Sequence, residues 1–283
     1  CDKFKIPLGT SYNGRGAIPE DEKLSIGRVG EFTPKYANKI VGNADVVFTL
    51  GYRFTEQSTN NWTLISKKAK LIQVDIDDYE LGKNQPADIA IIGDAKSVVE
   101  QISNVIDDLR YKPSDKRIER INLIYNEKLE WKEKQKWAME DTSVPIKPQY
   151  VIHTIRKKLD RNAIICADAG SNKRWAGTLL EIYEPRTWIH SGGFAPMGYA
   201  LPAAIGAKVA NPEKQVLAII GDGAFQMVMQ ELMVAIEQKL PIIIVVFNDY
   251  GLGVIRLLQK LFYGNNIFAS NFSHKVDHAN IAK

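Results

Sequence analysis

The chain has 283 residues, of which 45% are hydrophobic and 25% are charged, a composition typical of a globular protein large enough for two domains. Its net charge of +4 arises from lysines and arginines scattered among acids, which argues against a nucleic-acid partner, and apolar runs such as Ile242–Phe247 are too short to cross a membrane. The two cysteines, Cys1 and Cys166, are too few for a disulfide framework and favour a cytoplasmic location.

Residues 1–111 are predicted to form a parallel α/β domain. Its expected strands are Val46–Leu50 and Leu71–Ile76, and its expected helices are Pro34–Val41 and Ala95–Leu109. Residues 112–147 are rich in charged side chains and carry no strand signal. We therefore expect them to form a helical connector that runs over the surface.

Residues 148–283 are predicted to form a second α/β domain, so that the chain consists of two doubly wound parallel-sheet domains joined by the connector. The expected helices of this domain are Pro148–Leu159, Met197–Val209, Gln226–Lys239 and Val254–Phe262, and its expected strands are Ala163–Ala167, Gln215–Ile220 and Ile242–Phe247. The chain lacks an initiator Met, the first domain begins abruptly at Cys1, and the second ends at Lys283 soon after a helix. We expect the chain to be part of a longer protein.

A metal and phosphate site is predicted where the strands of the second domain end. The segment Gly221–Gly223 directly follows an apolar strand and precedes a helix, a position where backbone N–H groups favour phosphate. Because an acid would repel a bare phosphate, Asp222 favours a bridging Mg²⁺. The next strand ends just before Asp249 and Gly251, and consecutive parallel strands usually pair. We therefore expect Asp249 and the carbonyl of Gly251 to complete the metal site.

Two other interpretations of these segments stay open. In the first alternative, Gly221–Gly223 and Asn248–Gly251 are two ordinary turns, for which Gly, Asp and Asn are the usual residues. A nicotinamide-dinucleotide-binding Rossmann site is the second alternative, because Gly221–Gln226 begins like G-x-G-x-x-G. Gln226 replaces the third glycine of that motif, and Asp222 would face a pyrophosphate without a metal. Both observations favour the metal and phosphate site.

The same segments resemble the diphosphate-binding signature of thiamine-diphosphate enzymes. The resemblance rests on Gly221–Met227, Gln230–Leu232, Leu240–Pro241, Asn248–Asp249, Ser191–Ala204 and Asp168–Ser171. It implies that Met197 props thiamine diphosphate into a bent shape and that Asp222, Asp249 and Gly251 bind Mg²⁺. The other cofactor-binding residues that it implies are Asp168, Ala169, Gly170, Ser171, Gly193, Gly221, Gly223, Ala224 and Gly253.

The first domain extends the resemblance to the acetolactate synthase family. The segments that carry it are Thr10–Glu20, Leu24–Gly30, Gly51–Phe54 and Gln73–Lys83. The resemblance implies the middle and diphosphate-binding domains of an enzyme that decarboxylates a 2-oxo acid such as pyruvate and joins the product to a second carbonyl. A 2-oxo acid decarboxylase or a pyruvate oxidase-type enzyme is the alternative within the superfamily, and a degenerate binding module is a third.

Three departures from the family pattern bear on the reaction and the cofactors. Asp249 stands where many relatives have Asn, and this aspartate resembles the catabolic, flavin-free acetolactate synthases. Leu258 stands where biosynthetic relatives have Trp, which argues against branched-chain biosynthesis. The segment Gly51–Phe54 resembles a turn that contacts FAD, whereas Gly30–Thr33 departs from the usual flavin loop. The resemblance therefore leaves FAD binding open.

The resemblance also implies that part of the active site lies outside the chain. In this family the glutamate that activates the cofactor belongs to a separate N-terminal domain, supplied by the other subunit of a dimer. We therefore expect no catalytic residue in this chain, a homodimer or tetramer for the intact protein, and weak cofactor binding without turnover by the chain alone.

Overall fold

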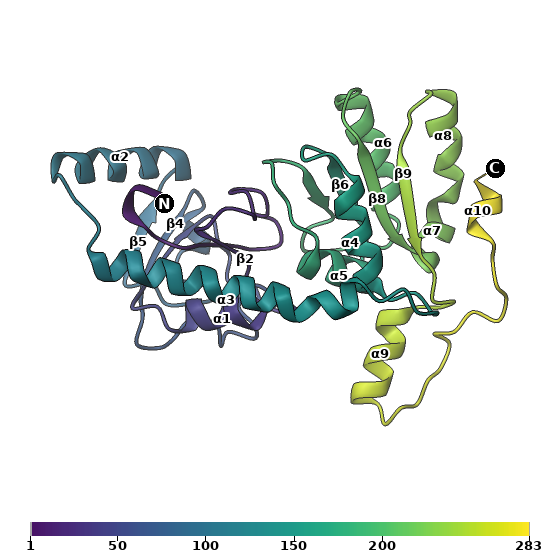
Figure 1. The fold of residues 1–283 in the computed structure, drawn as a ribbon, viewed down its shortest axis with the longest axis horizontal. Coiled ribbons are helices and arrows are strands. Elements are labelled where there is room, and N and C mark those ends of the chain that lie inside the picture. Colours follow the sequence, from purple (N-terminus) through teal and green to yellow (C-terminus); the bar gives the residue numbers. More distant parts are fainter. Residues whose placement is uncertain (1, 283) are drawn as a thin grey trace. The chain divides into compact units, whose positions relative to one another are not determined.

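The computed structural model describes residues 2–282, so that Cys1 and Lys283 lie outside the described residues. The chain forms two compact units (Figure 1). The first comprises Cys1–Tyr12 and Glu22–Gln135, and the second comprises Asn13–Asp21 and Lys136–Lys283. The segment Asn13–Asp21 therefore belongs to the second unit, although the sequence groups it with the first domain. The domain boundaries expected at residues 111 and 147 stay predictions.

The first unit contains two small sheets, and both are parallel. The strand order is β3 (Val46–Leu50), β4 (Lys70–Asp75), β5 (Ile89–Ile92) in one sheet, and β1 (Leu8–Thr10) pairs with β2 (Ser25–Arg28) in the other. The helices are α1 (Lys35–Gly42), α2 (Ala95–Asp108) and the first part of α3 (Asp115–Met139), with 3-10 turns at Asp2–Phe4 and Asp78–Glu80. The predicted strands and helices are confirmed to within two residues, whereas β1, β2 and β5 were not predicted.

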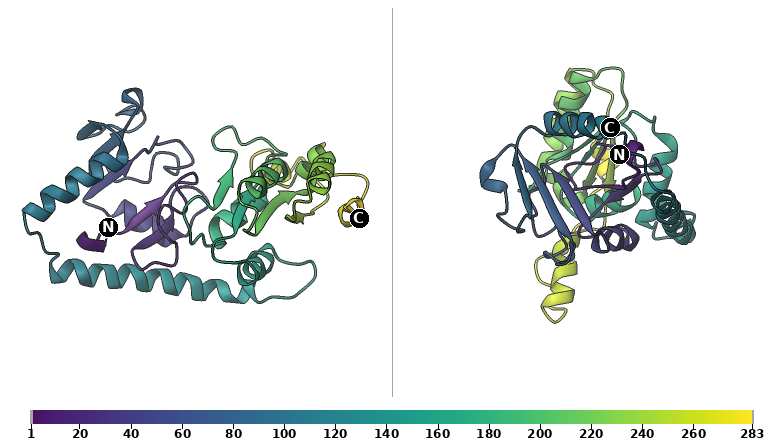
Figure 2. Two further views of the ribbon diagram at one scale, coloured as in Figure 1. Left: turned by 90° about the horizontal axis from the view of Figure 1, so that it is seen from above. Right: turned by 90° about the vertical axis from the view of Figure 1, so that its left-hand side faces the viewer.

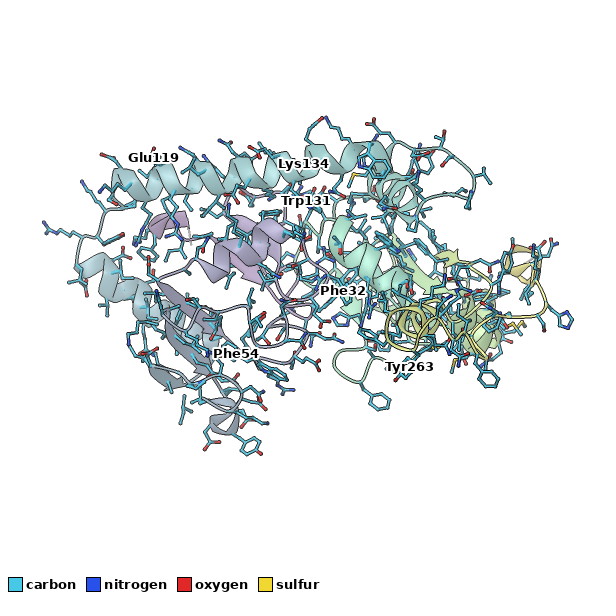
Figure 3. The ribbon with its side chains drawn as sticks, turned by 90° about the horizontal axis from the view of Figure 1, so that it is seen from below. Phe32, Phe54, Glu119, Trp131, Lys134 and Tyr263 are labelled. Carbon is cyan, nitrogen blue, oxygen red and sulfur yellow. The ribbon has the colours of Figure 1, made fainter. Side chains whose placement is uncertain are left out.

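The connector helix α3 is part of the core of the first unit. Ile124 is buried in a cluster with residues of β2 and α1. The side chain of Trp131, labelled in Figure 3, lies against Tyr36 of α1, with 5.9 Å between the ring centroids. The ammonium group of Lys128 is also buried, and it donates hydrogen bonds to the carbonyls of Glu22 and Ser25. The connector is thus helical, as expected, but one of its faces is packed.

The second unit contains a four-stranded parallel sheet with helices on both faces (Figure 2). The strand order is β7 (Trp188–His190), β6 (Ile164–Ala167), β8 (Val216–Gly221), β9 (Ile243–Phe247). The helices are α4 (Pro148–Lys158), α5 (Ser171–Leu179), α6 (Ala200–Ala210), α7 (Asp222–Val228), α8 (Leu232–Glu237), α9 (Gly253–Phe262) and α10 (His278–Ile281). These elements confirm the predicted α/β class, and α5, β7 and α10 are additions to it.

The core of the second unit lies on both sides of β8, as the alternation of side chains along a strand requires. Ala218 and Ile220 are buried in one cluster with α6, α7 and α8, whereas α5 packs on the opposite face, where Ile219 is also buried. The chain runs from β6 outward to β7 and then returns to β8 on the other side of β6. The carboxyl ends of β6 and β8 therefore flank a topological switch point, where open parallel sheets bind ligands.

Two predicted helices differ from the observed ones in their boundaries. The helix expected at Gln226–Lys239 is divided into α7, a 3-10 turn at Met229–Glu231, and α8, and it begins four residues earlier, at Asp222. The helix expected from Met197 begins at Ala200. The N-cap of α7 is Gly221, and Asp222, in the first turn, places a negative charge at the positive end of the helix dipole. Within residues 2–282, none of the helices combines the length and apolar character that a membrane span requires.

Candidate functional site

Three acidic residues follow the ends of three neighbouring strands in the second unit. Asp168 follows β6, Asp222 is the first residue after β8, and Asp249 lies two residues beyond β9. β8 pairs with β9 in register from Leu217 with Ile243 to Gly221 with Phe247. The pairing expected from the sequence is therefore observed, and it brings the loops that follow both strands to one edge of the sheet.

Asp222 is buried, and backbone N–H groups hold its carboxylate. It is 2% exposed, its Oδ1 accepts the N–H of Gly223 at 2.9 Å, and its Oδ2 accepts the N–H of Gly251 at 3.0 Å. The second bond joins the start of α7 to the loop after β9. Asp222 and Gly251, two of the three residues predicted to bind metal, are thus in direct contact.

Asp249 is half-exposed and lies beside both a cation and a carboxylate. Its Oδ2 accepts from Nη2 of Arg256 at 2.5 Å, in the first half of α9. Burial raises the pKa of Asp249 above its ordinary value; the Arg256 charge opposes this shift and the nearby Asp222 carboxylate adds to it. The two acids are therefore close enough for their charges to interact.

Two glycines in the loop after β9 allow close approach of neighbouring groups. A Cβ on Gly251 would lie 2.3 Å from the carbonyl oxygen of Ser270, and a Cβ on Gly253 would lie 2.4 Å from Oδ2 of Asp249. The segment around Ser270 also pairs with this loop, because the N–H of Leu252 donates to the Ser270 carbonyl at 2.8 Å. A side chain at either glycine would displace Asp249 or this pairing.

Asp168 connects the end of β6 to the start of α6. It is fully buried, and its carboxylate accepts the N–H groups of Gly198 at 3.0 Å and Ala200 at 2.7 Å. Burial raises the pKa of Asp168, and these backbone hydrogen bonds lower it. The next residues, Ala169 and Gly170, lead into α5 at Ser171, so that Asp168–Gly170 form the connection between β6 and α5.

Met197 lies next to the first turn of α7. Its Cε would be 3.4 Å from a Cβ on Gly223, and the same position is 3.0 Å from Leu252 and 3.2 Å from Phe272. The side chain of Met197 is 37% exposed, and Gly193, in the preceding loop, is also exposed. The residues Gly221, Gly223, Ala224 and Met197 are therefore neighbours of the acidic edge.

Two contributors to this site, Arg256 and Asn172, were not predicted from the sequence. Arg256 pairs with Asp249, and its Nη1 also donates to Oδ1 of Asn271 at 2.8 Å. Asn172 is buried and donates to the carbonyls of Asp168 and Ile219, which ties α5 to β6 and β8. Arg256 lies about one helical turn after Gly253, and this spacing could have predicted that Arg256 lies near Asp249. Nothing in the sequence connects Asn172 to these carbonyls.

The donor set at the edge matches the oxygen preference of Mg²⁺. It consists of the two carboxylates of Asp222 and Asp249; the N–H of Gly251 donates to Asp222, and the Gly251 carbonyl stays a predicted ligand. In the part of the chain that the structure describes, no cluster of three His, Cys, Asp or Glu side chains offers a metal site. An all-side-chain site of the zinc type is therefore not found in residues 2–282.

Comparison with protein families matches most of the chain. Residues 1–102 match the central domain of thiamine pyrophosphate enzymes, and residues 168–283 match their C-terminal TPP binding domain. The match to these domains favours the thiamine-diphosphate interpretation over the dinucleotide alternative.

Comparison with individual proteins gives relatives along the whole chain. The chain is 34% identical over 292 residues to the probable acetolactate synthase large subunit of Methanococcus aeolicus, with 99% of this chain and 48% of that protein covered. It is 36% identical over 285 residues to its counterpart in Methanocaldococcus jannaschii (99% and 47%) and 32% identical over 282 residues to the Escherichia coli acetolactate synthase isozyme 3 large subunit (100% and 49%). The chain thus spans about half the length of these relatives, and it belongs to the thiamine pyrophosphate enzymes.

Proposed function

We propose that the edge formed by Asp222, Asp249 and Gly251 binds Mg²⁺ and, through it, the diphosphate of thiamine diphosphate. The observation that carries the proposal is the hydrogen bond from the N–H of Gly251 to Oδ2 of Asp222, which joins the ends of β8 and β9 and brings Asp249, two residues before Gly251, to the same edge. A divalent cation would offset the repulsion between the two carboxylates, and Mg²⁺ shares its coordination shell with phosphate oxygens. The backbone of Gly251, held against Asp222, lies within the same edge.

The residues around this edge would bind and orient the rest of the cofactor. We assign the diphosphate to the backbone of Gly221–Ala224, Asp168–Ser171 and Gly253, and the apolar part of the cofactor to Met197. Thiamine diphosphate supplies a carbon nucleophile and an electron sink for the decarboxylation of 2-oxo acids. The role of this chain is to neutralise the diphosphate and to fix the cofactor in position.

The reaction that we propose for the intact protein is decarboxylation of a 2-oxo acid such as pyruvate, followed by joining to a second carbonyl. The similarity to acetolactate synthase large subunits along the whole chain supports carboligation over simple decarboxylation or oxidation. Analysis of the product from pyruvate distinguishes these reactions. Acetolactate indicates carboligation, acetaldehyde indicates simple decarboxylation, and acetyl phosphate indicates oxidation.

Association into a homodimer or tetramer is part of the proposal. Large apolar side chains are exposed on α7 and α8, among them Met227, Met233 and Ile236 at 57%, 57% and 63%. Such a surface is typical of protein contacts. We assign the activating glutamate to another part of the longer protein, and the cytoplasmic location stays a prediction from the cysteine content.

FAD binding by the first unit stays open. Phe54 of the flavin-like turn is buried, and Tyr52 donates to the carbonyl of Ser58, so that these two side chains hold the turn itself. Arg53 is exposed and is the residue of this turn that is free to face a ligand. The visible absorption spectrum of the purified protein would show whether an oxidised flavin is bound.

The test of the proposal is a calorimetric titration of thiamine diphosphate into the intact protein, with and without Mg²⁺. We expect binding that requires Mg²⁺ and is abolished by Asp222→Ala, because the variant loses a metal ligand and the anchor for Gly251. Asp94→Ala is the control, since Asp94 is an exposed cap of α2 in the first unit. Absence of binding by the wild-type protein, or Mg²⁺-independent binding, would overturn the proposal.

A further inference from the structure

The segment Asn13–Asp21, here named the strap, is part of the second unit although the residues on either side of it belong to the first. Its backbone pairs with the connection between α5 and β7, because the N–H of Glu20 donates to the carbonyl of Ile182 at 2.8 Å. At Gly16 it approaches so closely that a Cβ would lie 2.8 Å from the carbonyl oxygen of Glu184. The strap is thus packed against this connection at two points.

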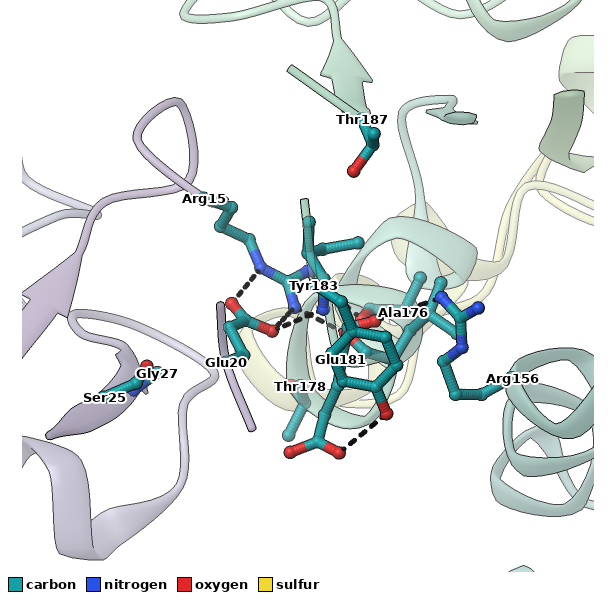
Figure 4. Close-up of polar contacts among 12 residues, drawn as sticks. Arg15, Glu20, Ser25, Gly27, Arg156, Ala176, Thr178, Glu181, Tyr183 and Thr187 are labelled. Atoms are coloured by element: carbon teal, nitrogen blue, oxygen red, sulfur yellow. Dashed lines mark hydrogen bonds and ion pairs between the residues drawn. The ribbon is translucent and has the colours of Figure 1, made fainter. Parts of the chain in front are cut away.

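A buried ion pair lies at the centre of the strap. Nε of Arg15 donates to Oε1 of Glu20 at 2.8 Å, and Nη2 donates to Oε2 at 2.6 Å (Figure 4). The two side chains are only 2% and 6% exposed. Such a two-pronged pair, removed from water, holds both side chains in one geometry.

The pair holds the end of α5 and the start of β7. Arg15 donates to the carbonyls of Ala176 at 3.4 Å and Leu180 at 2.5 Å, and Glu20 accepts the N–H of Ile182 at 3.0 Å. The guanidinium also lies 4.6 Å from the ring centroid of Trp188, the first residue of β7, in the range of a cation–π contact. One ion pair therefore contacts both elements and the connection between them.

These two elements carry, at their opposite ends, two loops of the candidate site. α5 begins at Ser171, directly after the loop Asp168–Gly170, and β7 ends at His190, directly before the loop that contains Met197. β7 is an edge strand of three residues that pairs with β6 on one side. A strand this short has few backbone hydrogen bonds of its own, so its position depends on the side-chain contacts at Trp188.

We propose that Arg15 and Glu20 are positioning residues for the binding of thiamine diphosphate. By fixing the far ends of α5 and β7, the pair sets the positions of the Asp168–Ser171 loop and of Met197 without touching the cofactor. The inference rests on the proposed function, since it names residues that support the same site.

Replacement of Arg15 by Lys tests the geometry of the pair while keeping its charge. Lysine lacks the planar fork with which Arg15 reaches both oxygens of Glu20 and two carbonyls together. We expect the dissociation constant of thiamine diphosphate in the presence of Mg²⁺ to rise roughly tenfold, the lower end of the effect of residues that orient the ligands of a metal site. The measurement is calorimetric titration of the intact protein, well below the unfolding temperature of each variant.

A second variant covers the case in which Arg15→Lys does not fold. The double replacement Arg15→Met, Glu20→Met leaves no buried charge without a partner, and such replacements are often tolerated. We expect it to fold and to show the same rise in the dissociation constant. Arg161→Met is the matched control, because Arg161 pairs with Asp21 of the strap at 2.7 Å but with side chains that are 51% and 38% exposed.

The outcomes separate this inference from the proposed function. Tight, Mg²⁺-dependent binding by the wild-type protein and by a folded Arg15 variant alike would overturn the positioning role and leave the proposed function intact. A lower unfolding temperature without a change in the dissociation constant would do the same, because it indicates a purely structural pair. Absence of binding by the wild-type protein would overturn both.

Discussion

Burial changes the chemistry of individual side chains in the sheet of the second unit. Cys166 and Asp168 lie two residues apart at the end of β6, and both are fully buried. The Asp168 carboxylate has backbone N–H partners, whereas burial raises the pKa of the Cys166 thiol from 9.0 to about 12. Cys166 is thus a core residue that stays protonated, as its apolar surroundings in the sequence indicate.

We expect Cys166 to resist alkylation by iodoacetamide in the folded protein at about pH 9, a prediction from its raised pKa. The unfolded thiol ionises first, so stability falls as the pH rises from 9.0 towards 12, by up to ~1.4 kcal/mol per pH unit. Labelling of a Cys1→Ser variant, with and without urea, isolates this thiol. Equal rates in both conditions would contradict the prediction.

Among the elements, α3 shows how a charged helix can still be part of a core. Ile121 and Ile124 are buried at 4% and 7%, whereas Leu123 is 59% exposed. Spacings of three or four residues lie on one face of a helix. The apolar face of α3 is therefore narrow, and the high charge of the remaining positions hides it in the sequence.

The packed face of α3 predicts a difference between two neighbouring substitutions. We expect Ile124→Ala to lower the free energy of unfolding of the first unit by about 2–5 kcal/mol, because it leaves a cavity among β2 and α1. We expect Leu123→Ala, at an exposed position of the same helix, to change it by no more than about 0.5 kcal/mol. Urea denaturation measures both; similar effects would mean that α3 is not packed in this way.

The elements predicted from the sequence are those with long apolar runs. β3, β8 and β9 have five or six residues and were predicted, whereas β1 and β7 have three and give no periodic signal. The acids Asp222 and Asp249 were predicted because each lies just after such a strand. The role of the Arg15–Glu20 pair depends on its contacts with Ala176, Leu180 and Ile182, which lie 161–165 residues away along the chain, and such contacts are not revealed by spacing.

At the scale of the whole molecule, the second unit is assembled from two separate stretches of the chain. The strap supplies a buried carboxylate to the N–H of Ile182 and a guanidinium to the carbonyls of Ala176 and Leu180. Without the strap, these backbone groups would lose their partners, which is costly for groups removed from water.

The contribution of the strap predicts the behaviour of a shortened chain. In a protein that begins at Lys136, we expect the amide of Ile182 to lose most of its protection from hydrogen exchange, because its acceptor on Glu20 is gone. The amide of Asp168 is the control, since it donates to Ile219 within the sheet. Full protection of Ile182 in the shortened, folded chain would contradict the prediction.

The strap also limits where homologous genes can recombine without loss of fitness. A crossover near Lys136 would combine residues 136–283 of one parent with Arg15 and Glu20 of the other. The buried charges of Arg15 and Glu20 would then face backbone groups of a different sequence. Viable chimaeras should therefore inherit both stretches from the same parent. In a library of hybrids, the codons for residues 13–21 and for 176–188 should be selected together, although they lie far apart in the gene.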